Sequence, residues 1–505
     1  MSAFPVPSAS IVVLVGTLLA LGACASAPPA SGTPGDEPVR ADAEAGLASV
    51  GFTLDHLDAL GEDVVVEGDT LRFVHIYAEP GPDGAWVFVG DDDEGFACVD
   101  DAARAAVVYL QHFEATGDES SRRTAVKLLR FVRHLQAESG LFYNFVWDRS
   151  MRINTEHANS VADDVSWWTA RAVWALGEGA RVLAEADPAE AAADADAVRR
   201  VEPHLDRLLA RYGEMADAGG RSFPQWLISG TAADATSELL LGLVALQDAR
   251  PTADGARRVR QFAEGLTRVR FGDLATFPYG GHAAWTGGWH GWGSSQTQAL
   301  AEAARLGMAE GALASAEAEA QSLYARLLVE GWLHTLDYAT GEAQAFEQIA
   351  YDLRPAAVGL VRLYEATGDE RYAVMAGLAA AWFHGLNPAG ATMADPATGR
   401  GYDGILSPTQ INANAGAEST VEAQMTLLAV AQHPEAAAWA WATADAPRTL
   451  TWQGHTVRAR TFSGASTAAS GPRVAIVVLD PEADASHLFV GPEAERFLAS
   501  ATPSP

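Results

Sequence analysis

The sequence predicts an all-α main domain whose helices close into an (α/α)6 toroid, with small β elements at both ends. Acidic residues open helices at the two ends of the helical region, in GFACVDDAARAAVVYL (Gly95 to Leu110) and INANAGAESTVEA (Ile411 to Ala423). These acids can meet only if the intervening helices return to their starting point. A ring of helices would place both clusters in one site.

Apolar residues recur at helical spacing in twelve segments, which pair into six hairpins. One joint is repeated, because EATGDE occurs at 114–119 and again at 365–370. We expect Gly117 and Gly368 to end a helix, and Asp118 and Asp369 to cap the next one. Repeated helix pairs favour closed or solenoidal stacking. The predicted helices are 100–115, 119–137, 162–184, 189–216, 232–249, 252–269, 293–307, 309–331, 352–367, 369–385, 417–432 and 434–444.

The chain divides into five predicted parts. Residues 11–23 are apolar but too short to span a membrane, and Cys24 follows them, which predicts a lipoprotein-type signal peptide over 1–24. Acylation of Cys24 would anchor the exported protein to a bacterial membrane, in the cell envelope. Composition then predicts a flexible linker (25–46), a small β-rich segment (47–95), the toroid (96–445), and a small β-rich C-terminal segment with a tail (446–505).

Charge and motifs exclude several functions. The formal net charge is −31 and Lys127 is the only lysine, so no basic surface for nucleic acid is expected. Nucleotide fingerprints, GxSxG elbows and metal-ligand spacings are missing, so we expect no nucleotide, no cofactor and no metal. With Cys24 acylated, Cys98 has no disulfide partner, and its apolar neighbours predict a buried structural thiol.

Long loops crowded with aromatic and polar residues interrupt the predicted helices, at 140–159, 220–232, 276–295 and 385–416. Sugar rings stack on aromatic side chains and hydrogen-bond to amides, carboxylates and histidines, so this mixture is typical of a glycan cleft. For any single tryptophan, packing within its loop is the alternative. The candidates for substrate binding are Tyr143, Trp147, His157, Asp163, Asp164, Trp226, Trp289, His290, Asn387, Asp403, Asn412 and Asn414, and Trp285 and Trp292 lie in the same loops.

Three acids at helix starts are the candidate catalytic residues. Glycoside hydrolysis needs one carboxyl group to protonate the leaving oxygen and a second to activate water or attack the sugar. Asp100 and Asp101 begin the first predicted helix and Glu418 begins the eleventh. Helix capping explains one acid at such a position, but it explains two adjacent acids less well.

Several motifs resemble those of a known fold family. GFACVDDAARA, GLFYNFVWDRS with DDVSWWTARAVWALGEGA, and WFHGLNPAGATMADPATGRGYDGI with INANAGAEST are similar to six-hairpin glycosidase-like toroids. These include toroid domains attached to some bacterial group 1 glycosyltransferases. An early aspartate pair, a late GxNP loop and a final Asn-rich Glu motif are more distantly similar to glycoside hydrolase family 9. That resemblance implies an inverting reaction with Asp100 or Asp101 as general base, Glu418 as general acid, and support from Asn387 and Asn412.

We therefore expect an exported glycoside hydrolase that acts on a poly- or oligosaccharide by two-carboxylate acid/base catalysis. Glu418 should be partly buried beside Ala415 and Ala417, which would raise its pKa. Two alternatives remain open. One is a polysaccharide lyase or sugar epimerase on the same toroid, with Tyr143, His157 and Arg149 as candidates for a lyase site. The other is a non-catalytic, surface glycan-binding lipoprotein.

Overall fold

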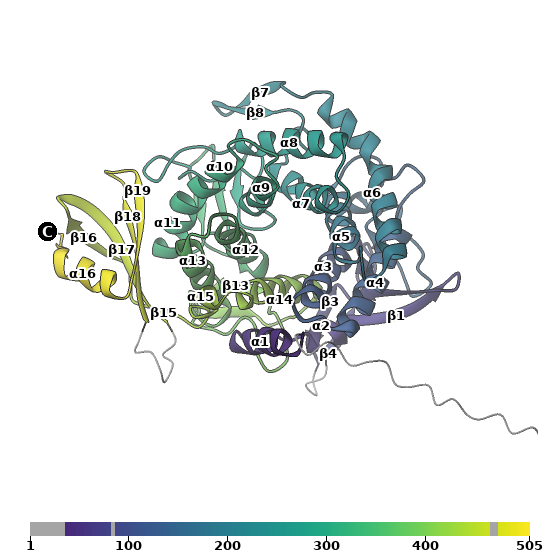
Figure 1. The fold of residues 1–505 in the computed structure, drawn as a ribbon, viewed down its shortest axis with the longest axis horizontal. Helices are drawn as coiled ribbons and strands as arrows, with labels where there is room; N and C mark the ends of the chain where they lie inside the picture. Colours follow the sequence, from purple (N-terminus) through teal and green to yellow (C-terminus); the bar gives the residue numbers. More distant parts are fainter. Residues whose placement is uncertain (1–35, 82–85, 465–472, 505) are drawn as a thin grey trace, which may run out of the picture.

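The computed structural model describes residues 36–81, 86–464 and 473–504, and the helices of these residues form a closed double ring (Figure 1). The last inner helix packs against the first, so the ring predicted from the sequence is confirmed. The inner helices are α3 (Val99–Thr116), α5 (Trp167–Val182), α7 (Ala233–Ala249), α9 (Gln296–Arg305), α12 (Ala350–Thr367) and α14 (Ala417–Ala431).

The outer ring pairs one helical segment with each inner helix. One of these segments is continuous but contains a π-helical turn, η2 (Ala320–Tyr324), between α10 (Ala312–Glu319) and α11 (Ala325–Glu330). The last outer helix was predicted over 434–444 but has only one turn, because the chain then turns and enters a strand. The other outer helices are α4 (Glu119–His134), α6 (Pro188–Leu209), α8 (Ala253–Thr267), α13 (Glu370–Ala380) and α15 (Pro434–Ala437).

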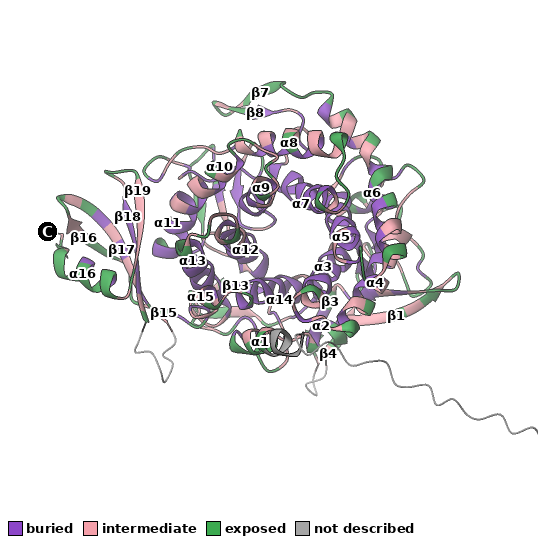
Figure 2. Ribbon diagram, viewed as in Figure 1, coloured by how far each residue is buried: buried purple, intermediate pink, exposed green. Residues whose placement is uncertain are grey.

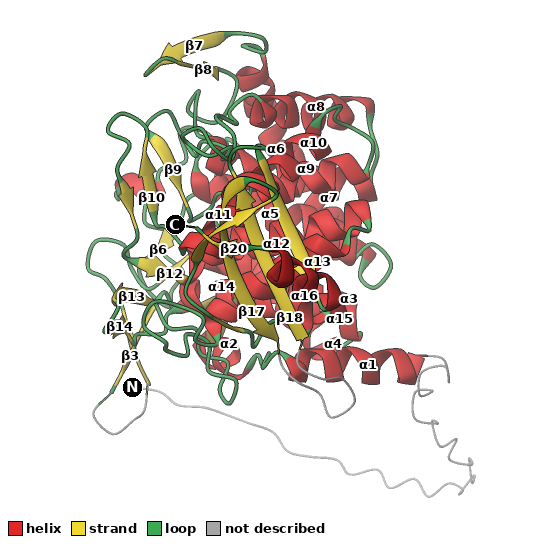
Figure 3. Cartoon of the chain, turned by 90° about the vertical axis from the view of Figure 1, so that its left-hand side faces the viewer, coloured by secondary structure: helices red, strands yellow, loops and turns green. Residues whose placement is uncertain are grey.

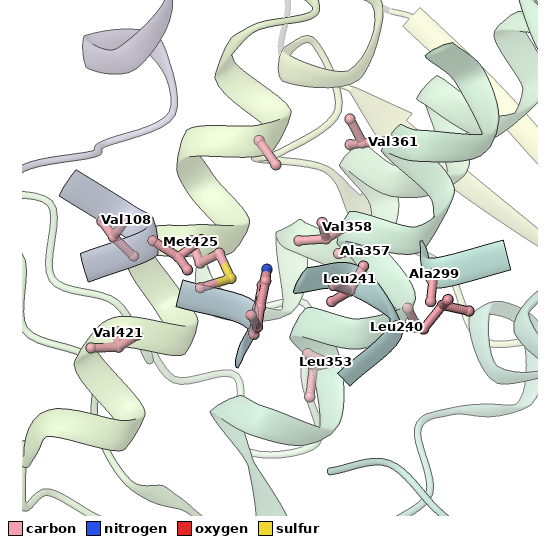
Figure 4. Packing of buried hydrophobic residues seen from close by; sticks show 14 of the residues in the cluster. Val108, Leu240, Leu241, Ala299, Leu353, Ala357, Val358, Val361, Val421 and Met425 are labelled. Atoms are coloured by element: carbon pink, nitrogen blue, oxygen red, sulfur yellow. The ribbon is translucent and has the colours of Figure 1, made fainter. Parts of the chain in front are cut away.

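The two rings of helices differ in how deeply they are buried. Inner helices are buried on nearly all sides, whereas outer helices are exposed on one face (Figure 2). Apolar side chains of α3, α7, α9, α12 and α14 meet in the core between them (Figure 4). Small residues allow the closest approach, since a Cβ atom at Gly242 of α7 would lie 2.2 Å from the carbonyl oxygen of Val173 in α5. Glycine is therefore required where these two helices touch backbone to backbone.

The repeated joint behaves as predicted. Gly117 and Gly368 end α3 and α12 with left-handed φ values of 66° and 70°. The carboxylate of Asp118 accepts hydrogen bonds from two backbone N–H groups of α4, and that of Asp369 accepts one from α13. Both joints connect an inner helix to its outer partner in two residues.

Short β elements surround the ring. Hairpins β1–β2 (Gly61–Val66, Asp69–Val74) and β3–β4 (Tyr77–Pro80, Trp86–Val89) precede the toroid, and β7–β8 (Met215–Ala218, Arg221–Pro224) projects from its edge. At one end of the helical body lie several further strands (Figure 3). These are β5 (Ala97–Cys98) with β6 (Phe145–Val146), β9 (Gly288–His290) with β10 (Thr335–Asp337) and β11 (Ala343–Gln344), and β12 (Gln348–Ile349) with β13 (Gly404–Ser407) and β14 (Gln410–Asn412).

The C-terminal segment forms an antiparallel sheet beside α11 and α13 (Figure 1). One face of this sheet packs on the toroid through residues such as Phe462 and Val477, and the other face is covered by α16 (Pro492–Ser500). Its strands are β15 (Thr443–Ala444), β16 (Arg448–Trp452), β17 (His455–Gly464), β18 (Arg473–Asp480), β19 (Ala485–Val490) and β20 (Thr502–Pro503).

The linker prediction is wrong in part, because Asp36–Ser49 form helix α1, which is followed by α2 (Asp55–Leu60). Leu47 and Val50 are buried, and α1 packs on α3 and α14, so tertiary contacts outweigh the composition of this stretch. The signal peptide, Cys24 and residues 25–35 lie outside the described residues. Within the described part, no helix combines the length and apolar character needed to cross a membrane.

Candidate active site

A cleft of about 850 Å³ opens at the end of the ring where the inner helices begin. It is lined by the N-terminal residues of α3, α5, α12 and α14 and by the connections that enter those helices. The structure brings all three candidate catalytic acids, Asp100, Asp101 and Glu418, to this cleft. Helix N-termini carry partial positive charge, which favours carboxylates at this end of the ring.

Arg104 joins the two acidic motifs. Its Nη2 atom donates to Asp101 Oδ1 at 2.8 Å and to Glu418 Oε2 at 3.1 Å. Its Nη1 atom donates to Oε1 of the fully buried Glu422 at 2.7 Å. Because one nitrogen holds both oxygens, these atoms of Asp101 and Glu418 lie within about 6 Å of each other. Residues from α3 and α14 therefore share one ion network.

Two further arginines extend this network around the axis of the ring. Arg171 pairs with Asp100 at 2.8 Å and with Glu238 at 2.9 Å. Arg354 pairs with Glu238 at 3.0 Å and with Glu422 at 2.6 Å. The hydroxyl group of Tyr351 donates to Glu238 at 2.5 Å and accepts from Arg171 at 2.8 Å. Each buried charge has an opposite partner, which is the condition for burying ions at tolerable cost.

Sequence reasoning missed this network, although a signal for it exists. Each inner helix places one long polar side chain within its first six residues, and all six point to the common axis through their mutual contacts. The pattern is visible only when the six helix starts are aligned with one another. The residues are Arg104, Arg171, Glu238, Gln298, Arg354 and Glu422.

The three acids have different surroundings. Asp101 is 3% exposed, and burial raises its pKa to about 6 despite the charge of Arg104, with further raising by Glu418 and Asp100. The side chain of Asp100 is 19% exposed, and it accepts a hydrogen bond from Asn144 Nδ2 at 3.1 Å. The side chain of Glu418 is 47% exposed, so it reaches further into the cleft than its position beside Ala415 and Ala417 suggested. The strongest burial thus falls on Asp101.

The loop of β13 and β14 supplies part of the lining of the cleft, through Asp403, Asn412 and Asn414, three of the candidates for substrate binding. Asp403 accepts a hydrogen bond from the hydroxyl group of Ser419 at 2.8 Å, and Asn412 Nδ2 donates to it at 3.4 Å. Burial raises the pKa of Asp403. These side chains are held in place beside Glu418.

Two substrate-binding predictions are wrong. Trp226 is fully buried, and its indole N–H donates to the carbonyl oxygen of Gln261, so it belongs to the core between α8 and the preceding loop. Asn387 Nδ2 donates to the carbonyl oxygens of Trp382 and Ala391, so it shapes its own loop. Five other candidates lie outside the lining of the cleft, namely Tyr143, Trp147, His157, Asp163 and Asp164.

Trp289 and His290 line a neighbouring cavity of about 600 Å³ rather than the cleft. His290 Nε2 lies 3.0 Å from Asp234 Oδ2, and its ring stacks on Trp292 with 3.7 Å between centroids. Trp292 and Trp167 line both cavities, so the two spaces are adjacent.

The segment before the toroid also reaches the cleft, which the sequence did not indicate. Tyr77, Glu79, Asp91 and Glu94 line its rim, and the hydroxyl group of Tyr77 donates to Glu94 at 2.8 Å. Glu347, in the connection that enters α12, also lines the cleft. Hairpin β3–β4 therefore contributes to the site although it lies outside the ring of helices.

Cys98 is a buried free thiol at the start of α3, in agreement with the structural role predicted for it. Its sulfur accepts a hydrogen bond from the backbone N–H of Asp101 at 3.4 Å, and burial raises the pKa of the thiol. Among the described residues, no group of three or more His, Cys, Asp or Glu side chains is placed to hold a metal ion.

Comparison with solved structures identifies the fold. A cellobiose 2-epimerase from Bacillus thermoamylovorans B4167 superimposes with a TM-score of 0.53 at 11% identity, over 78% of this chain and 98% of the epimerase. The chain has the six-hairpin (α/α)6 toroid fold. A sugar epimerase from a ruminal bacterium (TM-score 0.52, 12% identity, 77% and 98% covered) and a D-mannose isomerase (0.50, 13%, 80% and 99%) are also similar. No protein-family model and no curated protein sequence matches the chain.

Proposed function

We propose that this protein is a carbohydrate-active enzyme that hydrolyses a glycosidic bond in the cleft. The observation that carries this proposal is the Arg104 bridge, which holds Asp101 and Glu418 from opposite ends of the chain within reach of one bound sugar. Two carboxyl groups in unlike surroundings are what glycoside hydrolysis requires. Toroids of this fold that act on sugars support the substrate class.

The surroundings of the acids suggest roles that reverse those implied by the family 9 resemblance. Asp101, whose pKa is about 6, can hold a proton near neutral pH and give it to the leaving oxygen. Glu418 projects into the cleft with Arg104 against one oxygen, which suits a charged carboxylate that attacks the sugar or activates water. Asp100, paired with Arg171, adds negative charge beside the developing oxocarbenium ion.

The separation of the pair bears on stereochemistry. Retaining glycosidases hold their carboxyl groups about 5–5.5 Å apart, and inverting ones about 6.5–9.5 Å apart. The two oxygens that share Arg104 lie within about 6 Å, which favours retention over the expected inversion. NMR of the first-formed anomer measures this directly. A product with inverted configuration would exclude Glu418 as a nucleophile and leave it, or Asp100, as the base that activates water.

The charge of the cleft argues against the lyase alternative. Eight carboxylates line it, at Glu79, Asp91, Glu94, Asp100, Asp101, Glu347, Asp403 and Glu418. Arg104 and Arg171 are the cations of this lining, and both are already paired with carboxylates. A uronate substrate needs a cation to neutralise its carboxylate, and its approach would be repelled. The residues named as candidates for a lyase site, Tyr143, His157 and Arg149, also lie outside the lining of the cleft.

Sugar epimerisation is the second candidate, because two of the similar structures are epimerases. An epimerase needs an acid/base group beside the carbon that loses its proton, and histidine is the commonest choice. His290, which pairs with Asp234 next to the cleft, is the histidine in position for that role.

The test is product analysis with residues 36–505 on neutral and acidic oligosaccharides, beside Glu418→Gln and His290→Gln. Hydrolysis releases new reducing ends, and we expect Glu418→Gln to abolish the release while His290→Gln retains it. A change of sugar configuration without chain cleavage, lost in His290→Gln, would replace the hydrolase with an epimerase. Binding of glycans without either product would leave a glycan-binding protein.

We also propose that the protein is exported and lipid-anchored through Cys24, since an apolar run followed by a cysteine and a polar segment supports it. Expression of the full chain in a bacterial host with Cys24→Ala as the matched variant tests this. We expect the wild-type protein in the membrane fraction with an acyl mass increment, and loss of both in the variant. Equal fractionation of the two proteins would contradict the anchor.

A further inference from the structure

The cavity next to the cleft has the features of a second binding compartment. We call it the tryptophan groove, because Trp167, Trp285, Trp289 and Trp292 all line it. Its volume of about 600 Å³ lies within the range of ligand sites in proteins. Since Trp167 and Trp292 also line the cleft, an extended ligand can pass from one space into the other without leaving the protein surface.

Trp285 is a large apolar ring left open to solvent. Trp285 is 53% exposed, whereas most large apolar residues that the structure describes are buried. The ring lies against the backbone of Gly287, where a Cβ atom would approach it to 2.6 Å. The missing side chain at Gly287 therefore leaves room for the ring beside the backbone at the groove. A flat exposed indole is the surface on which a sugar ring stacks.

Trp289 provides an independent indication of a ligand. The residue is 4% exposed and lines the groove, yet its buried indole N–H has no hydrogen-bond partner among the described residues. Buried donors are nearly always satisfied, and leaving one unpaired costs free energy. The same loop thus carries one exposed ring and, beside the groove, one buried donor without a partner among the described residues.

The polar lining sets the charge of that ligand. Asp337 and Glu342 come from the β10–β11 hairpin, and Gln344, Ser229 and Thr231 add uncharged groups. Neither lysine nor arginine is among the described residues that line the groove. His290 is already engaged with Asp234 and with the carbonyl oxygen of Trp292. Hydroxyl groups can bind these acceptors, but a carboxylate or sulfate on the ligand would find no counter-charge.

From these contacts we infer that the tryptophan groove binds the part of the substrate beyond the scissile bond, so that the substrate is an oligosaccharide of non-anionic sugars spanning both spaces. This inference rests on the proposed function for the cleft, but binding in the groove can be measured without turnover. The inference specifies the length and the charge of the substrate, and the fold alone indicates neither.

The experiment compares Trp285→Ala with the parent in the Glu418→Gln background, by titration calorimetry. The probes are cello-, manno- and chito-oligosaccharides from two to six sugars, and oligogalacturonates of the same lengths. For at least one non-anionic series, we expect affinity that rises with length in the parent. We expect Trp285→Ala to lower the affinity for the longest member about tenfold and that for the disaccharide less than twofold. Gly287→Ala should give a smaller loss because it displaces the ring without removing it.

Trp441→Ala is the matched control, because this tryptophan is 39% exposed, lines neither the cleft nor the groove, and stacks on His384. An equal loss of affinity in Trp441→Ala, an equal loss for short and long probes in Trp285→Ala, or tighter binding of oligogalacturonates would each overturn the inference. Absence of length-dependent binding in every non-anionic series would overturn it as well. Length-dependent binding that needs Trp285, in a protein that cleaves none of the probes, would retain the groove and remove the hydrolase.

Discussion

The two ends of the toroid are built from the same six inner helices, yet only one end opens into a large cleft. The helix N-termini surround a space of about 850 Å³, whereas the C-termini surround one of about 220 Å³. Both ends contain arginine and carboxylate pairs. At the closed end these include Arg181 with Glu114 at 2.6 Å and Arg305 with Asp248 at 2.9 Å. Residue type alone therefore does not mark the active end.

The connections make the difference. At the closed end, joints of two to six residues, such as Gly117–Asp118, link inner to outer helices and leave little room for a wall. At the open end, each return from outer to inner helix is long, as in 135–166, 268–295 and 384–416. Helix N-termini add a potential that favours acids there, and C-termini favour arginines at the other end. Long connections and the direction of the helices together place the candidate active site at one end.

The largest expected effect separates the ends by activity. Glu418→Gln should lower turnover about 10³-fold while leaving the melting temperature nearly unchanged, because the side chain is half-exposed and keeps its shape. Glu365→Gln at the closed end is the matched control and should retain turnover. Burial acts to raise the pKa of Glu365, but the charge of Arg362 and a hydrogen bond from His433 hold it at about 2. Turnover lost equally in both variants would remove the distinction between the ends.

A second prediction compares buried with exposed arginines. Arg354→Met leaves Glu238 and Glu422 buried with one cation fewer, so the free energy of unfolding should fall by about 3–5 kcal/mol. Arg305→Met at the closed end removes a half-exposed pair and should cost about 0–1 kcal/mol. Urea denaturation measures both. Similar losses of free energy of unfolding in the two variants would mean that the buried and the exposed ion pairs contribute equally to stability.

A third prediction uses pH. Burial raises the pKa of Glu302, at the closed end, from 4.5 to about 7. The folded protein therefore binds this proton more tightly than the unfolded chain, and the resulting stability is complete below pH 4.5 and lost as pH rises through 7. Relative to Glu302→Gln, the wild-type protein should lose roughly 3 kcal/mol or less across that window. Asp101→Asn should show the same trend at the open end, ending near pH 6. If the difference in free energy of unfolding between the wild-type protein and either variant did not change with pH, burial would not be raising the pKa of that carboxyl group.

The smallest expected effect concerns the repeated joint. Asp118→Ala and Asp369→Ala each remove a helix cap at the closed end and should each lower the free energy of unfolding by about 1 kcal/mol. Activity should not change, because both caps lie at the far end of their helices from the cleft. Chemical denaturation with a parallel turnover assay gives both values. A change in turnover at constant stability would link the closed end to catalysis.

The ring and the meeting of its two acidic motifs could be predicted from sequence, because helix periodicity, glycine stops and aspartate caps are local signals. The inward direction of Arg171 or Arg354 could not, since it depends on how each helix is rotated about its own axis. The residues wrongly predicted to bind substrate are also explained by burial in the folded protein. Trp226 stands in a polar, glycine-rich loop like its neighbours, and only packing against α8 separates it from Trp285.

The position of helix α1 distinguishes the two ends of the toroid. It packs so closely on the C-terminal end of α14 that a Cβ atom at Gly46 would lie 2.7 Å from the carbonyl oxygen of Ala431. Figure 3 shows α1 at the opposite end of the helical body from strands β6, β12, β13 and β14. The described chain therefore begins on the side away from the residues that line the cleft. If Cys24 is acylated as proposed, a membrane on the side where α1 begins would leave the mouth of the cleft open to polymers too large to reach the lipid surface.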